Sequence, residues 1–231
     1  DLPLKAEAKS NLNTYFGNDI VQSSQYFTRV GPVNANVNHD ELSLIYEMTN
    51  YQSVPLADAL QRDKLYATLM FTSLGIPMLW EGMDISQSRG WTQDASNRLS
   101  YRPVDWSLLP TPRGVSHFNY YRSLILQRTY NPALYNGVLW RPLYENESQR
   151  SLAWGFVDTL SNSKIVVVAN LSGTEQVLAN VTWLGTGTWY DVFDQSVYTV
   201  TTNTVSTFNI PAYTARVFSN RTNADLGITT S

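Results

Sequence analysis

The sequence of 231 residues contains no cysteine and only two histidines. The lack of thiols excludes cysteine nucleophiles and cysteine-bound zinc, and it leaves no disulfide to indicate the redox compartment. Two histidines are too few for a multi-histidine metal site. Charged residues make up 15% of the chain and the net charge is −3, which argues against nucleic acid as a partner. No apolar run approaches the roughly 18 residues of a membrane span, so we expect no membrane partner.

Lysine is also scarce, whereas asparagine, serine and threonine are abundant, a balance that favours a secreted or extracellular protein over a cytoplasmic one. No signal peptide is visible at Asp1, so it has either been removed or the gene begins elsewhere. What the chain does have is aromatic residues, with 7 Trp, 14 Tyr and 8 Phe. Such rings stack on the apolar faces of sugars, but they also fill the cores of β-rich proteins.

The segment Val33–Glu41, with the sequence VNANVNHDE, combines a strand pattern with a polar cluster. Apolar and polar residues alternate at its start, which predicts a short strand. Asn38, His39, Asp40 and Glu41 follow directly where that strand would end. An imidazole beside two carboxylates is costly to assemble unless a ligand or a reaction uses them. The alternative is structural, with Asp40 as the N-cap of a helix that runs through residues 42–46.

A helix and a second strand follow. Apolar residues recur at helical spacing over Ala57–Thr72, with Asp58 near the start of the helix. The next run, Ile76–Trp80, is uniformly apolar, as parallel strands covered on both faces are. Strand, helix and strand predict a parallel βαβ unit, with the polar clusters 38–41 and 81–84 both at carboxyl ends of strands. In barrels of such units the chemistry is found at those ends.

Three segments together resemble the α-amylase family of glycoside hydrolases. Val33–Glu41 is similar to the end of that family's seventh barrel strand, and Gly75–Asp84, with the sequence GIPMLWEGMD, is similar to its eighth strand. Ile210–Phe218 resembles the closing strand of the family's C-terminal β-sandwich. The three occur in the family's order and cover most of the chain. The resemblance implies the last part of a (β/α)8 barrel followed by that sandwich.

The same resemblance implies site residues. Asp40 matches the third carboxylate of the family's retaining mechanism, which binds sugar hydroxyls more tightly as the ring approaches the oxocarbenium ion. His39 matches the neighbouring substrate-binding histidine, and Asn38 and Glu41 are expected to contact substrate beside it. Asp84 stands where many members have glutamate, and it is expected to act there as a substrate-binding acceptor. The presence of Glu41 after Asp40 does not distinguish an enzyme that hydrolyses glucans from one that transfers them.

A long polar and aromatic stretch, residues 85–116, follows the second strand. Loops of this length are usually functional or disordered. Arg89 and Trp91 are its candidate substrate-binding residues, and the pair Asp105-Trp106 resembles a segment of branching enzymes. The alternative for Trp91 and Trp106 is that they cover the barrel rim without touching substrate.

The rest of the chain predicts a helix over Phe118–Arg128 and then antiparallel strands. We expect residues 1–135 to be the C-terminal part of a TIM barrel, 136–220 a β-sandwich and 221–231 a tail or linker, an α/β part followed by an all-β part. Eight short alternating runs with turn signals support the sandwich. They cover residues 138–144, 152–157, 165–169, 176–181, 188–193, 197–201, 205–210 and 213–219.

No segment matches the first six barrel strands, including those that carry the family's nucleophile and general acid. A closed barrel takes about 250 residues, so we expect an N-terminal companion polypeptide to complete it. Structural calcium, frequent in the family, would be bound mainly by that companion. The partner expected from the resemblance is an α-1,4-glucan such as starch, glycogen or maltodextrin. The alternatives are a non-catalytic glucan-binding or scaffold protein, and a lectin-like protein whose aromatic rings gather on the sandwich, at Trp183 and Trp189.

Overall fold

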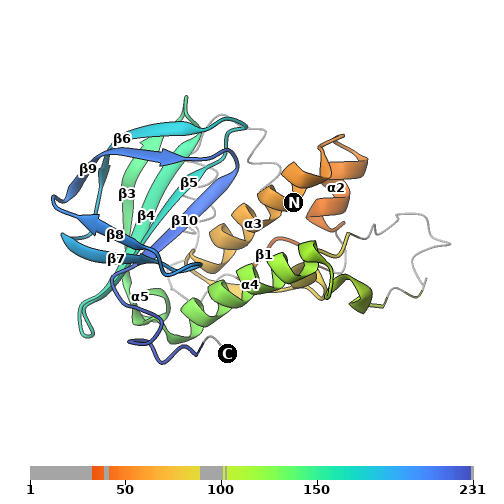
Figure 1. Ribbon diagram of the computed structural model, residues 1–231, viewed down its shortest axis with the longest axis horizontal. Helices are drawn as coiled ribbons and strands as arrows, with labels where there is room; N and C mark the ends of the chain where they lie inside the picture. The colour runs from red at the N-terminus through yellow and green to blue at the C-terminus, as the bar shows by residue number, and fades with distance from the viewer. Residues whose placement is uncertain (1–32, 39–41, 89–100, 102, 230–231) are drawn as a thin grey trace.

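Helices and two short strands form the first half of the described chain, and longer strands form the second half (Figure 1). The computed structural model describes residues 33–38, 42–88, 101 and 103–229. His39, Asp40, Glu41, Arg89 and Trp91 lie outside them, as does the segment before Val33. No described helix is both long and apolar enough to span a membrane.

The first two strands, β1 (Val33–Ala35) and β2 (Ile76–Met78), pair in parallel, with Val33 opposite Ile76 and Ala35 opposite Met78. The predicted parallel strand–helix–strand unit is therefore confirmed. Coverage on both faces is confirmed only in part, because Met78 is half-buried but Ile76 is 48% exposed and Val33 is 61% exposed. Two strands alone cannot cover their own faces and edges.

Three helices follow or separate these strands: α2 (Leu44–Asn50), α3 (Leu56–Phe71) and α4 (Pro112–Tyr130). The sequence predicts α4 only from Phe118, six residues too late. Its start is set by Thr111, whose hydroxyl accepts a hydrogen bond from the Gly114 amide at 3.1 Å, and by Pro112 at the first helical position. The stretch before α4 contains two short 3₁₀ helices, η2 (Met83–Ile85) and η3 (Trp106–Leu108), and Trp106 is 68% exposed.

All eight predicted runs of the second half form strands, and every pairing among them is antiparallel. They build a six-stranded sheet, in the order β3-β4-β5-β10-β7-β8, and a two-stranded sheet, β6-β9. The short helix α5 (Pro132–Tyr135) precedes them. The strands are β3 (Val138–Asn146), β4 (Ser151–Asp158), β5 (Ser163–Asn170), β6 (Gln176–Thr182), β7 (Gly187–Asp191), β8 (Val197–Val200), β9 (Thr204–Ile210) and β10 (Thr214–Ser219).

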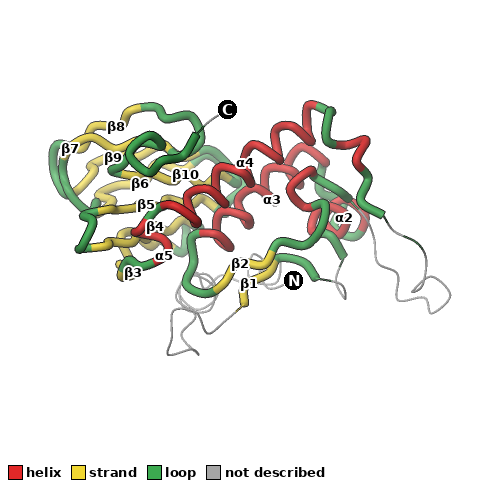
Figure 2. Tube along the Cα trace, turned by 90° about the horizontal axis from the view of Figure 1, so that it is seen from below, coloured by secondary structure: helices red, strands yellow, loops and turns green. Residues whose placement is uncertain are grey.

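The central strands of the large sheet are buried on both faces (Figures 1 and 2). Val166, Val168 and Phe218 pack in one cluster with residues of β6 and β9, whereas Val167 and Val217 pack in the cluster that includes the helices. Period-two alternation along each strand sends neighbouring side chains to these two cores. The sheet is thus the middle layer between the small sheet and the helices.

Trp183 and Trp189 lie inside the sandwich core, 2% and 1% exposed. Trp183 packs on Phe218 with ring centroids 5.3 Å apart and meets Trp189 edge-on at 5.8 Å. Buried rings cannot stack on a sugar at the surface, so a lectin-like site built on these two tryptophans is wrong. Their role is packing.

The end of the described chain contacts α4. The Gln127 amide donates to the Asn223 side-chain oxygen at 3.0 Å, and the Arg122 guanidinium donates to the Thr229 carbonyl at 3.2 Å. Ile228 is 6% exposed. The proposed boundaries at residues 135 and 220 stay predictions.

Candidate functional site

The candidate site lies where β1 and β2 end, because a parallel pair brings both carboxyl ends to the same edge of its sheet. Asn38 and Asp84 are the two predicted site residues within the described part of the chain. Asn38 is half-buried and follows Asn36 and Val37, which are 4% and 2% exposed. The roles of Asn38 and Asp84 stay predictions, as do those of the five site residues outside the described part.

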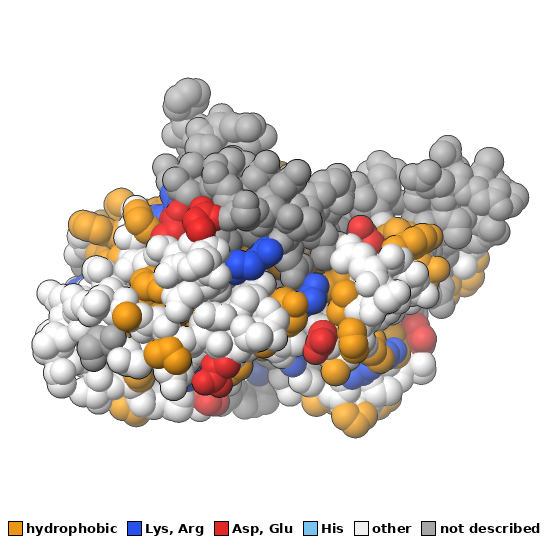
Figure 3. Space-filling model, turned by 90° about the horizontal axis from the view of Figure 1, so that it is seen from above, with side chains coloured by type: hydrophobic (Ala, Val, Ile, Leu, Met, Phe, Trp, Pro, Cys, Tyr) orange, Lys and Arg blue, Asp and Glu red, His pale blue; other side chains and the backbone are white. Residues whose placement is uncertain are grey.

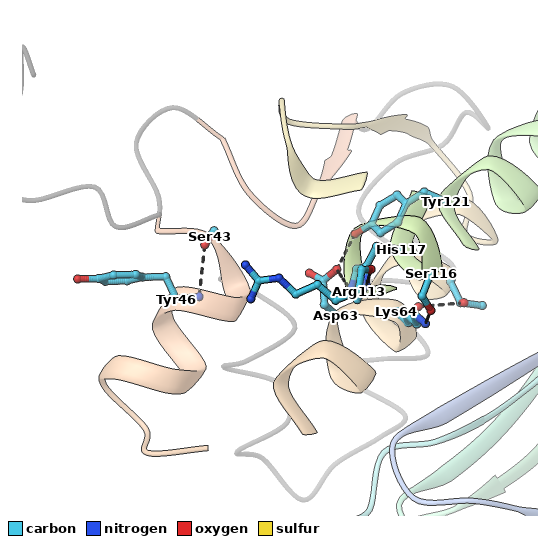
Figure 4. Close-up of polar contacts among 9 residues, drawn as sticks. Ser43, Tyr46, Asp63, Lys64, Arg113, Ser116, His117 and Tyr121 are labelled. Carbon is cyan, nitrogen blue, oxygen red and sulfur yellow. Dashed lines mark hydrogen bonds and ion pairs between the residues drawn. The ribbon is translucent and has the colours of Figure 1, made fainter. Parts of the chain in front are cut away.

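The backbone on either side of residues 39–41 is held firmly. Before it, the side-chain amide of Asn34 donates to the Leu74 carbonyl at 2.6 Å. This bond joins β1 to the segment that leads into β2. After it, Ser43 is the N-cap of α2 and accepts a hydrogen bond from the Tyr46 amide at 3.3 Å (Figure 4). The structural alternative in which Asp40 caps this helix is therefore wrong, because Ser43 holds that position.

The entry to β2 is fixed by one side chain of α4. Arg128 donates to the carbonyls of Phe71 at 3.3 Å and Ser73 at 2.8 Å, and also to that of Gly75. The last carbonyls of a helix have no partner inside the helix. A single guanidinium thus satisfies the end of α3 and sets the path of the chain into β2.

The exit from β2 is a tight turn. Gly82 has φ +80°, a conformation that costs glycine little, and a Cβ there would lie 2.8 Å from the Gln87 side-chain oxygen. The Gln87 amide nitrogen donates to the Gly82 carbonyl at 2.9 Å, and the Gln87 side-chain oxygen accepts from the Asp105 amide at 2.8 Å. The turn that carries Asp84 is therefore fixed by hydrogen bonds of the Gln87 backbone and side chain.

Asp84 is half-buried, and this burial raises the pKa of its carboxyl group. Its negative charge is one of the causes that raise the pKa of Tyr121 on α4, after burial and the neighbouring Asp63. Asp84 is therefore electrostatically coupled to α4.

Between that helix and α3 lies a buried acid–base cluster that is not among the residues predicted from the sequence: Asp63, His117 and Tyr121, each at most 2% exposed (Figure 4). The Tyr121 hydroxyl donates to Asp63 Oδ2 at 2.9 Å, and His117 Nε2 lies 3.6 Å from the same oxygen. His117 Nδ1 lies 3.2 Å from the Arg113 carbonyl oxygen.

Burial moves both titrating groups of this cluster towards their neutral forms. It raises the pKa of Asp63 to about 7, and burial together with the positive charge of Lys64 lowers the pKa of His117 to about 4. Perturbed pKa values are typical of catalytic groups, but they also occur in structural networks. Side chains this deeply buried cannot reach a substrate, so the cluster joins α3 to α4.

One feature of the sequence indicates this cluster. Asp63 lies in the row Ala59, Asp63, Tyr66 and Met70, spaced by four, three and four residues, and all four are buried. An acid on the apolar face of a helix requires a partner, because a lone buried carboxylate is costly. The partners come from a helix about 55 residues later, and nothing in the spacing identifies them.

A metal centre has no support from the described side chains, among which no group of three or more His, Asp or Glu could hold an ion. Bound calcium in a companion segment stays a prediction.

No protein-family model matches the chain, and none of the curated proteins does. Solved structures do. A pullulanase from Bacillus acidopullulyticus superposes on 93% of this chain with a TM-score of 0.70 and 22% identity. An α-amylase from Geobacillus thermoleovorans, complexed with acarbose, covers 83% with a TM-score of 0.61 and 18% identity. A type I pullulanase from Bacillus subtilis, complexed with maltose, covers 81% with a TM-score of 0.61 and 16% identity.

The match covers most of this chain but only a part of each solved structure. The chain spans 27% of each pullulanase and 39% of the α-amylase. The similarity therefore concerns a part of those enzymes, and it includes most of this chain. The chain shares its fold with a part of pullulanases and α-amylases, which confirms, at the level of fold, the resemblance to the C-terminal part of α-amylase-family enzymes.

Proposed function

We propose that this chain is the C-terminal part of an enzyme that hydrolyses or transfers α-1,4-glucan chains by a retaining mechanism. The observation that carries the proposal is the parallel pairing of β1 with β2. It supports the convergence of the segments 38–41 and 81–84 at one edge, the place where barrels of this kind have their chemistry. Acarbose and maltose in two of the similar structures support an α-glucan as the ligand.

In this proposal Asp40 is the third carboxylate. Its oxygens accept hydrogen bonds from hydroxyls of the reacting sugar, and these bonds strengthen as the ring flattens towards the oxocarbenium ion. His39 donates to a neighbouring hydroxyl. Asn38, Glu41 and Asp84 line the same edge, and Arg89 and Trp91 belong to the segment that follows β2.

The nucleophile and the general acid come from other barrel strands, supplied by an N-terminal companion segment. The exposure of Val33 and Ile76 supports this, because apolar side chains of a parallel pair are normally covered by further strands and helices. Residues 1–135 then belong to the barrel, 136–220 to the sandwich, and 221–231 to a tail.

The test is Asp40→Asn in the intact protein, assayed on maltooligosaccharides. Loss of a few kcal/mol of transition-state binding lowers turnover by about 10²–10³-fold. Asp58→Asn is the matched control, because Asp58 is an exposed carboxylate in the first turn of α3. Equal melting temperatures verify that both variants fold.

Near-wild-type turnover in Asp40→Asn contradicts the role of Asp40. If the unsubstituted protein binds maltooligosaccharides but converts none of them, the alternative function applies, a non-catalytic glucan-binding or scaffold protein with the same fold.

A further inference from the structure

A cavity lies between the helices and the sandwich, and residues at the ends of β1 and β2 do not line it. Its volume is about 560 Å³, within the range of roughly 300–1,000 Å³ that is ordinary for small-molecule sites. Its wall includes Lys64 and Tyr120 from the helices, and Phe193, Asp194 and Asn209 from the sandwich. Glu175, in the turn before β6, completes the rim.

An aromatic pair is fixed in one wall of this cavity. The rings of Tyr120 and Phe193 stack with centroids 4.2 Å apart and an interplanar angle of 11°. The Tyr120 hydroxyl bonds with the Thr68 hydroxyl at 2.7 Å, and the Phe193 amide donates to Asp191 Oδ1 at 2.9 Å. The two rings cover one face of each other, and the Lys64 ammonium lies over Tyr120 at 5.4 Å from its ring centroid. The half-buried Phe193 ring is therefore the main apolar surface that the wall offers, and its stacking on Tyr120 limits the ordering that binding requires.

The rim carries hydrogen-bonding groups that are not used by the fold. Glu175 and Asn209 are exposed, and the structure records no side-chain hydrogen bond for either of them within the described residues. Asp194 uses Oδ1 to accept the Ser196 amide at 2.8 Å, and Lys64 donates one bond, to the Ser116 hydroxyl at 2.7 Å. Acceptors and donors thus stand beside an aromatic wall.

The charges of the lining favour a neutral ligand over a strongly charged one. Arg216 donates to Asp191 Oδ2 through Nε at 3.0 Å and through a terminal nitrogen at 2.8 Å, which neutralises both side chains. Glu175, Asp194 and Lys64 remain, two negative charges against one positive charge. Figure 3 likewise shows acidic and basic side chains scattered over the face that it draws, with no extended patch of one sign.

We propose that this cavity binds a neutral carbohydrate, an α-glucan segment, as a second sugar site separate from the strand ends. A sugar has an apolar face for the aromatic wall and hydroxyls that both donate and accept, which matches the mixed rim. Carbohydrate as the ligand class follows from the lining, whereas the choice of α-glucan rests on the proposed function.

The test is a calorimetric titration of the intact protein with maltotetraose, and in parallel with cellotetraose, in the Asp40→Asn background. We expect two phases with maltotetraose. The double variant Glu175→Ala/Asn209→Ala is expected to weaken one phase about tenfold or more, through loss of two hydrogen-bonding side chains. Asn203→Ala is the matched control, because Asn203 is an exposed asparagine that does not line the cavity.

A phase that the double variant weakens, and that Asn203→Ala leaves unchanged, supports the site. If that phase also appears with cellotetraose, the cavity is a carbohydrate site that does not depend on the proposed function. Identical isotherms for the double variant and its parent overturn the inference. Near-wild-type hydrolysis in the Asp40→Asn parent refutes the proposed role of Asp40, so the two failures are distinguishable.

Discussion

The buried pair Asp63 and His117 predicts opposite pH dependences of stability for two single variants. The pKa of Asp63 is raised from 3.8 to about 7, so the folded state binds more protons than the unfolded state between these values. Its contribution is complete below pH 3.8 and is lost as the pH rises to about 7. The pKa of His117 is lowered from 6.5 to about 4, so its contribution is complete above pH 6.5 and is lost as the pH falls to about 4.

The two magnitudes are similar. One pKa unit corresponds to about 1.4 kcal/mol, so Asp63 contributes a change of up to about 4 kcal/mol and His117 one of up to about 3 kcal/mol. Between pH 4 and 6.5 the contribution of Asp63 falls with pH while that of His117 rises at about the same rate. The two slopes nearly cancel, so this pair leaves the free energy of unfolding of the unsubstituted protein almost independent of pH in that range. Asp63→Asn removes the first contribution and keeps an acceptor for the Tyr121 hydroxyl. His117→Gln removes the second.

Urea unfolding of the intact protein, followed by circular dichroism from pH 4.5 to 7.5, measures these slopes. Relative to the unsubstituted protein, stability is expected to rise with pH in Asp63→Asn and to fall with pH in His117→Gln. Asp58→Asn, at an exposed carboxylate, is the control and is expected to follow the unsubstituted protein. Relative slopes of the same sign in both variants would refute the reasoning. A maximum near pH 5.5 that both variants flatten would show that the pair is an ion pair instead.

Three structural substitutions give further tests, each read as a change in the free energy of unfolding. Trp154→Phe removes the indole donor to the Thr72 carbonyl at 2.8 Å and is expected to cost about 1–3 kcal/mol, because it leaves a buried acceptor unpaired; no loss would mean that the bond is not formed. Gly82→Ala is expected to cost at least about 1 kcal/mol, since φ is +80° and the new Cβ would meet Gln87, and an unchanged midpoint would contradict this geometry. Thr111→Ala is expected to cost about 1 kcal/mol through loss of the α4 cap, and Thr111→Ser should restore most of it.

The strands of the sandwich are predictable from sequence because their pattern is local. Alternation with period two and turn residues mark each run, and both signals lie within a few residues of the strand they define. The order of the strands in the sheet is not local. β10 lies between β5 and β7, and only contacts between distant segments, such as Val217 opposite Val167, determine this.

The candidate site shows the same division. The parallel pairing of β1 with β2 is predictable because an apolar run after a helix has few other arrangements. The N-cap of α2 is less so, because Asp and Ser cap helices about equally well, and the cap is Ser43 and not the Asp40 of the structural alternative. The Asp63 cluster is beyond prediction, because one acid on an apolar helix face indicates a partner without identifying it.

The sandwich stabilises the start of β2 through the helices that lie between them. Trp154 of β4 donates to the Thr72 carbonyl at the end of α3, and Gln61 of α3 donates to the Tyr213 carbonyl and to the Thr214 hydroxyl, both at 3.2 Å. Because Arg128 then binds three carbonyls between α3 and β2, the strand starts from a point that is fixed on two sides. A substitution in β4, such as Trp154→Phe, should therefore disturb the start of β2, although the two are far apart in sequence.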